Sequence, residues 1–169
     1  GNENWKFNVT VARWIGTDAD FHKAANWSTG EVPDEETHAR IETASSTILA
    51  KTPVTVRSLA VGGGAGAATL RSTNAFVVIG NTEVLTNGTW IADWPAVVSN
   101  AVLVRAGGIV THTANGATEL YKLNLTVAGN MTIDAGGSVD VQNKGYYGGN
   151  GPGATGGASH GGRGGGRTV

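Results

Sequence analysis

The sequence lacks cysteine entirely among its 169 residues. Disulfide bonds, thiolate catalysis and cysteine-based zinc sites are therefore excluded. Charged residues are also scarce, at 15% of the chain against about 25% in ordinary soluble proteins. The formal net charge of -1 does not provide the basic surface that nucleic acids require. No apolar run approaches the roughly 18 residues of a membrane-spanning helix. We therefore expect neither a nucleic-acid partner nor a membrane span.

Glycine and strand-forming residues are abundant and unevenly distributed. The chain contains 27 glycines, of which 12 fall between positions 145 and 169, together with 20 threonines and 18 valines. Eight of the 13 acidic residues lie within residues 1–42. This distribution predicts three zones: an N-terminal cap over residues 1–46, a strand-rich body over 47–144 and a glycine-rich extended segment over 145–169.

Most of the chain alternates apolar with polar residues over short stretches, which is typical of strands with one buried face. A single helix is predicted over Asp18–Trp27, where Thr17 or Asp18 supplies the N-terminal cap. Ten strands are predicted: Lys6–Trp14, Ala39–Glu42, Ser46–Leu49, Thr55–Val61, Ala75–Ile79, Ala101–Arg105, Ile109–Thr113, Leu123–Val127, Met131–Asp134 and Ser138–Gln142.

A weak internal repeat relates the segments 70–78, 104–112 and 133–141, at sequence offsets of 34 and then 29. Each copy has an apolar residue, a charged residue, a corner of small residues and an alternating strand. Such repeats indicate stacked units that bury their faces on one another. We therefore predict an all-β, right-handed parallel β-helix (β-solenoid) with an N-terminal cap. The alternative is a β-sandwich or jelly roll, favoured by the hairpin-like turn Thr86–Thr89.

In a β-solenoid the inward residues of successive rungs form columns. The residues that we expect to be buried in these columns are Leu59, Val61, Leu70, Phe76, Val104, Val110, Leu125, Val127, Ile133, Val139 and Val141.

Several motifs resemble those of large secreted or autotransporter-type bacterial surface proteins. Trp14-Ile-Gly16 followed by Ala24-Ala-Asn-Trp-Ser-Thr-Gly-Glu-Val-Pro33 is similar to their N-terminal segments, and residues 123–146 resemble their β-helix coils. The resemblance implies a secreted or cell-surface bacterial location and a non-catalytic structural or adhesive module of a larger protein. It carries over no catalytic residue.

Two aromatic groups are candidate ligand-binding sites. Trp90, Asp93 and Trp94 lie close together in a predicted loop, where flat rings could stack on sugars and the acid could bind hydroxyls. The alternative is a loop held by two buried tryptophans. Tyr146 and Tyr147 form a second, weaker patch. The alternative function is therefore a carbohydrate-binding or carbohydrate-active β-helix of the glycoside hydrolase or polysaccharide lyase type, with a polysaccharide or other cell-surface glycan as partner.

No metal, cofactor or catalytic site is predicted. Asp18-x-Asp20 matches a calcium loop poorly, because the next residues are Phe21 and His22, and it is better explained by acids at a helix N-terminus. The four histidines form neither an HxH nor an HExxH pattern.

The glycine-rich segment has few side chains with which to pack, so other structure must hold it. We expect the chain to be a piece of a longer protein, in which following sequence or another chain packs on this segment and covers the end of the solenoid.

Overall fold

The computed structural model describes residues 10–147, within which it contains fifteen β-strands and one short 3-10 helix. The predicted strand residues 6–9 and residues 148–169 of the glycine-rich segment lie outside the described part. The elements, in chain order, are β1 (Thr10–Arg13), η1 (Ala24–Asn26), β2 (Thr37–Ile41), β3 (Ile48–Ala50), β4 (Val54–Val56), β5 (Ser58–Val61), β6 (Ala68–Ser72), β7 (Phe76–Val78), β8 (Thr82–Val84), β9 (Gly88–Ala92), β10 (Ala96–Val98), β11 (Val102–Val104), β12 (Ile109–Thr111), β13 (Leu125–Val127), β14 (Met131–Ile133) and β15 (Ser138–Val139).

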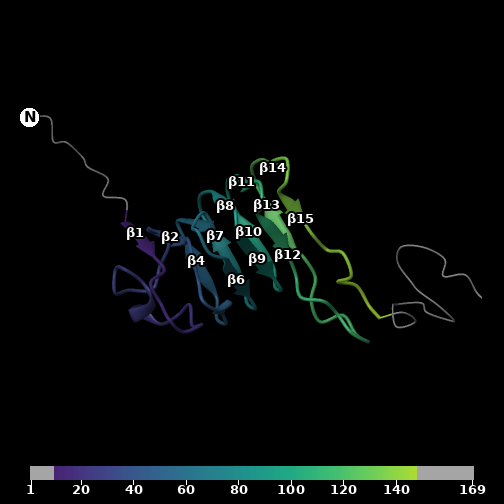
Figure 1. Ribbon diagram of the computed structural model, residues 1–169, viewed down its shortest axis with the longest axis horizontal. Helices are drawn as coiled ribbons and strands as arrows, with labels where there is room; N and C mark the ends of the chain where they lie inside the picture. Colours follow the sequence, from purple (N-terminus) through teal and green to yellow (C-terminus); the bar gives the residue numbers. More distant parts are fainter. Residues whose placement is uncertain (1–9, 148–169) are drawn as a thin grey trace, which may run out of the picture.

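The strands form three parallel sheets that run the length of the stack (Figure 1). Their orders are β1-β2-β5-β8-β11-β14, β3-β6-β9-β12-β15 and β4-β7-β10-β13, and every pairing between these strands is parallel. Three successive strands, one in each sheet, make one rung: β8, β9 and β10 are an example. The all-β, stacked parallel arrangement is compatible with the predicted β-solenoid, whereas a sandwich built from hairpins would pair its strands antiparallel.

The strand register gives the true spacing of the rungs. Phe76 pairs with Ala96, an offset of 20 in the sequence, and Ala96 pairs with Leu125, an offset of 29. The predicted offset of 29 is therefore confirmed. The offset of 34 is wrong, because Leu70 stacks beside Trp90 in one sheet and Val104 belongs to another.

Corner residues with positive φ join strands of different sheets. Gly107 (φ 76°) and Gly136 (φ 84°) follow β11 and β14, and Asn87 (φ 61°) occupies the matching place after β8. The turn over Thr86–Thr89 is therefore a corner of the stack and not the hairpin that the alternative sandwich requires. A Cβ on the next residue, Gly108, would lie 2.3 Å from the Val84 carbonyl oxygen. Glycine thus allows neighbouring rungs to approach closely at this corner.

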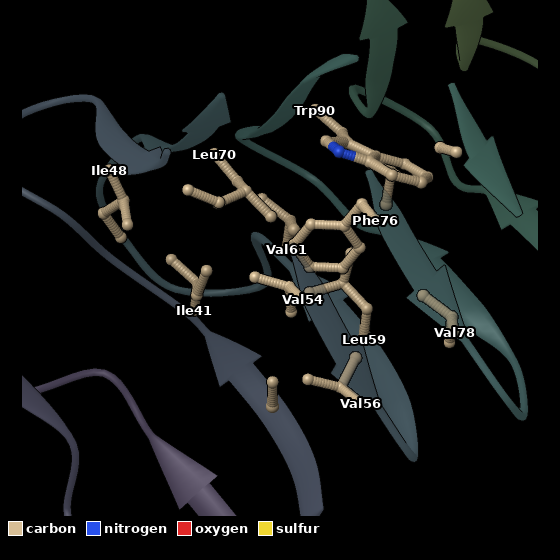
Figure 2. Packing of buried hydrophobic residues seen from close by; sticks show 14 of the residues in the cluster. Ile41, Ile48, Val54, Val56, Leu59, Val61, Leu70, Phe76, Val78 and Trp90 are labelled. Carbon is tan, nitrogen blue, oxygen red and sulfur yellow. The ribbon is translucent and has the colours of Figure 1, made fainter. Parts of the chain in front are cut away.

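The core consists of columns of inward side chains, one from each rung. In the six-stranded sheet, Ile41, Val61, Val84 and Val104 are aligned by register and are all 0% exposed. Figure 2 shows neighbouring core residues, including Leu70, Phe76 and Trp90, converging between the sheets.

The predicted core is correct in the body of the stack and wrong at its last rung. The buried members are Leu59, Val61, Leu70, Phe76, Val104 and Val110. Leu125, Val127 and Val139 are only partly buried, while Ile133 and Val141 are 47% and 49% exposed. Ile133 pairs with Val104 and therefore occupies the expected column. It is exposed because β14 is the last strand of its sheet in the described part of the chain, so a neighbouring strand covers it on one side only.

The predicted helix over Asp18–Trp27 is reduced to the 3-10 turn Ala24–Asn26. Side-chain hydrogen bonds replace helical ones in this segment. The Asn26 Nδ2 group donates to Asp18 Oδ1 at 2.5 Å and to the Asp20 carbonyl oxygen at 2.8 Å. The Trp27 indole N–H donates to the Phe21 carbonyl oxygen at 2.8 Å.

The N-terminal segment contacts the first edges of two sheets. Strand β1 pairs with β2, and the Leu49 N–H of β3 donates to the Ala19 carbonyl oxygen at 2.7 Å. Its aromatic rings continue into the core through edge-to-face contacts. The centroid of the Phe21 ring lies 5.0 Å from that of Trp27 and 6.0 Å from that of Phe76. The ring centroids of Phe76 and Trp90 are 5.8 Å apart. Large apolar side chains of this segment therefore pack against the core of the stack.

We predict that a charge in the middle of a column destabilises the fold far more than the same charge at its end. Val104→Asp should lower the free energy of unfolding by roughly 3 kcal/mol or more, because the carboxylate is buried without a partner. Ile133→Asp, in the same column, should lower the free energy of unfolding by less than about 1 kcal/mol, because Ile133 is half-exposed. Urea unfolding of both variants measures the difference, and equal losses would contradict the column assignment.

Candidate functional site

A long connection interrupts the regular rungs at one corner of the stack. Residues 93–95 connect β9 to β10, whereas residues 112–124 connect β12 to β13. The rung offset rises from 20 to 29 here because the second connection is longer. This connection extends away from the strands as the green loop beneath β12 and β13 (Figure 1). Because β9 pairs with β12 and β10 with β13, the two connections are neighbours. We call residues 112–124 the corner loop.

Asp93 anchors the start of the corner loop. Its side chain is 2% exposed, and Oδ2 accepts from Arg71 Nε at 2.6 Å. The Thr113 N–H donates to Oδ1 at 2.6 Å, and the Thr113 hydroxyl donates to Oδ2 at 2.8 Å. Both carboxylate oxygens are therefore engaged by the protein, so Asp93 fixes the loop.

Arg71 joins Asp93 to a tyrosine of the corner loop. Its guanidinium carbon lies 5.4 Å from the centroid of the Tyr121 ring, within cation–π range. Partial burial by itself would lower the pKa of Arg71, but the hydrogen bond and the charge of Asp93 outweigh it and raise that pKa. Arg71 therefore stays charged and holds the loop through two contacts.

The buried side chain of Asn115 fixes the middle of the loop. Its Oδ1 accepts from the Leu120 and Tyr121 N–H groups at 2.7 and 2.8 Å. Its Nδ2 donates to the carbonyl oxygens of Tyr121 at 2.7 Å and Lys144 at 3.1 Å. A loop of this length is thus ordered by side-chain hydrogen bonds, because it has no strand pairing of its own.

A cavity of about 440 Å³ lies between the two connections. Trp94 is 52% exposed beside it. Lys122 Nζ lies 3.4 Å from Glu119 Oε1, and the Tyr146 hydroxyl donates to Glu119 Oε2 at 3.1 Å. The lining residues are Asp93, Trp94, Pro95, Glu119, Leu120, Tyr121, Lys122 and Asn124.

The structure separates the two tryptophans that the sequence grouped. Trp90 is 0% exposed, lies against Phe76 and donates its indole N–H to the Ser72 hydroxyl at 3.3 Å. Its expected exposure is wrong, because it is an inward residue of β9 that stacks on Leu70. Trp94 alone of this pair is accessible to a ligand.

The tyrosine patch lies beside the corner loop. Tyr146 contacts Glu119 of the loop, and the Tyr147 N–H donates to the Gly116 carbonyl oxygen at 3.0 Å. The Tyr147 side chain is exposed. Both patches expected from the sequence thus contact the corner loop, and a binding role for Tyr146 and Tyr147 stays a prediction.

Sequence reasoning missed the residues that the corner loop contributes to the cavity: Glu119, Leu120, Tyr121, Lys122 and Asn124. A signal for them exists in the sequence. Once the regular rung offset of 20 to 23 is recognised, the offset of 29 at the last rung reveals an insertion. Insertions in solenoids often form loops on the binding face.

Two acidic side chains away from the cavity have local partners. A hydrogen bond from Lys23, supported by the Asp20 N–H and Asn26, lowers the pKa of Asp18 to about 2. Asp134 pairs with Arg105 at 3.1 Å. The described residues contain no group of three histidine, aspartate or glutamate side chains that could hold a metal ion.

A second cavity, of about 410 Å³, lies on the outer face of the six-stranded sheet. Its polar residues include His38, which contacts the Ser58 hydroxyl at 2.5 Å, and Arg40, whose Nε lies 3.4 Å from Glu42. Its lining contains no aromatic ring other than the His38 imidazole. It therefore lacks the flat apolar surface that distinguishes the cavity beside Trp94.

Comparison with known proteins found no matching family model and no significantly similar curated protein or solved structure. Across residues 10–147, none of the helical structure is long and apolar enough to cross a membrane.

We predict that Asp93→Asn lowers the free energy of unfolding by roughly 2–4 kcal/mol, because it leaves the partly buried Arg71 without its counter-charge. Glu83→Gln is the matched control. Glu83 lies 3.9 Å from Arg105 in an exposed pair, so its loss should change stability by less than about 0.5 kcal/mol. Denaturant titration compares the two, and equal effects would show that Asp93 does not anchor the loop.

Proposed function

We propose that this chain is a non-catalytic structural module of a larger secreted or cell-surface bacterial protein. In this proposal the stack is a right-handed parallel β-helix, and the described part of residues 1–46 is its N-terminal cap. Its role is to continue a rigid rod of stacked rungs and to carry surface loops outward.

The exposed apolar residues of the last described rung carry the proposal. Met131, Ile133 and Val141 are 41%, 47% and 49% exposed. Ile133 continues a column that is fully buried in the four preceding strands of its sheet. The edges of β13, β14 and β15 also offer backbone groups for a further parallel strand. The occupant that fits this surface is another rung with aliphatic residues in the same register.

The opposite end of the stack supports the capping role. There Phe21 and Trp27 are fully buried, Phe21 lies edge-to-face against Phe76 of the core, and β1 pairs with β2. The two ends of the described stack therefore differ: one has buried aromatic side chains packed on the core, and the other presents exposed aliphatic side chains. A solenoid that continues in one direction has this asymmetry.

The low charge content, the abundance of glycine and threonine and the resemblance of the Trp14–Pro33 motif support a location outside the cytoplasm. These features support a module of a larger surface protein.

The experiment uses an antibody raised against the folded chain. Immunoblots of cells and medium from the source bacterium should show a polypeptide much larger than the 17.2 kDa of this chain. Protease added to intact cells should digest it, or it should appear in the medium, while a cytoplasmic marker enzyme stays intact. A protease-protected polypeptide of about the chain's own mass, confined to the cytoplasm, would contradict the proposal.

A further inference from the structure

We propose that the cavity between Trp94 and the corner loop binds a neutral pyranose unit of a polysaccharide, with the sugar's apolar face stacked on the Trp94 ring. This binding function goes beyond the structural role proposed above. It can fail or hold independently of that role, because the cavity is formed entirely within the described chain.

The exposure of Trp94 has no structural explanation in the fold. The strand register Ala92 with Ser72 places residues 93–95 opposite residues 73–75, so Trp94 occupies the place that Asn74 has one rung earlier. The preceding rung thus makes this corner without an aromatic residue. A half-exposed indole leaves a large apolar area in water, which costs free energy unless a ligand covers it.

The chemistry around the ring suits a saccharide. A pyranose has a C–H face that stacks on an aromatic ring and a rim of hydroxyl groups that require hydrogen-bond partners. The cavity places carboxylate, ammonium and amide groups, from Glu119, Lys122 and Asn124, in its lining with Trp94. Apolar walls with a few polar groups are the usual composition of a ligand site.

The charges in the cavity indicate a neutral sugar. Lys122 is paired with Glu119 at 3.4 Å, and Asp93 is paired with Arg71 at 2.6 Å. Each charged group that lines the cavity therefore has a partner of opposite sign. A uronic acid or sulfated sugar would bring a charge that these pairs leave without compensation.

The anchored loop makes the site rigid before a ligand arrives. Asp93, Arg71 and Asn115 fix the corner loop at its start and middle. A preformed site loses less conformational entropy on binding than a mobile loop would. The volume of about 440 Å³ is in the range of ordinary ligand sites, roughly 300–1,000 Å³.

The experiment titrates the full chain calorimetrically with neutral hexasaccharides of glucose, xylose and mannose, and with hexagalacturonate as the acidic comparator. At least one neutral hexasaccharide should bind, with an affinity that changes little between about 50 and about 500 mM salt. Trp94→Ala should weaken this binding about tenfold or more, and Trp94→Phe should retain most of it.

Two further variants separate the site from general effects. Lys122→Ala should weaken binding by removing a hydrogen-bond donor in the cavity. Ile15→Ala, at an exposed apolar residue outside the cavity, should leave the affinity unchanged. Trp94, Lys122 and Ile15 are all exposed, so we expect each variant to fold. Circular dichroism checks that it does.

Three results would overturn the inference. They are no binding of any neutral hexasaccharide, neutral binding that Trp94→Ala leaves unchanged, and salt-sensitive binding of hexagalacturonate alone.

Discussion

Parallel, in-register pairing of successive rungs is the constraint on which this structure depends. It places each inward side chain directly against the equivalent side chains of the rungs before and after it, as in the column Val61, Val84 and Val104. Burial therefore depends on neighbours along the stack more than on residue type. This is why Val104 is fully buried while Ile133, an equally apolar residue in the same column, is half-exposed. Corners must also allow close approach, which explains Gly108.

The strand content and stacked architecture could be predicted because the alternation of apolar and polar residues is local. The register could not, because corners between different sheets are all short runs of turn-forming residues. Ser72–Asn74 leads from β6 to β7, whereas Gly107-Gly108 leads from β11 to β12, which belong to a different pair of sheets. The predicted strands also omit β6, β8, β9 and β10. Around β9 the turn-forming pair Asn87-Gly88 obscures a strand that contains Trp90. The predicted helix failed because Asn26 bonds to Asp18 and Asp20, an arrangement that helix propensity does not describe.

The candidate site was predicted in part. Trp94 is exposed, as the carbohydrate-binding alternative requires, but Trp90 belongs to the core. The Asp93 carboxylate is already bonded to Arg71 and Thr113. The other half of the cavity comes from the corner loop, which is the equivalent connection of the next rung. Only the register brings the two segments together. The loop departs from the repeat, and its order depends on side-chain anchors in the regular rungs, so the site depends on the same stacking as the core.

The central claim is that each rung is stabilised by its neighbours on both sides. Hydrogen–deuterium exchange of the folded chain, followed by mass spectrometry, tests it most directly. We expect the slowest exchange in β8, β9, β11 and β12, which have paired neighbours on both sides. Exchange should be much faster in β14 and β15, which have a neighbour on one side only within the described chain. Equal protection of these two groups of strands, or the strongest protection in β14 and β15, would contradict the account.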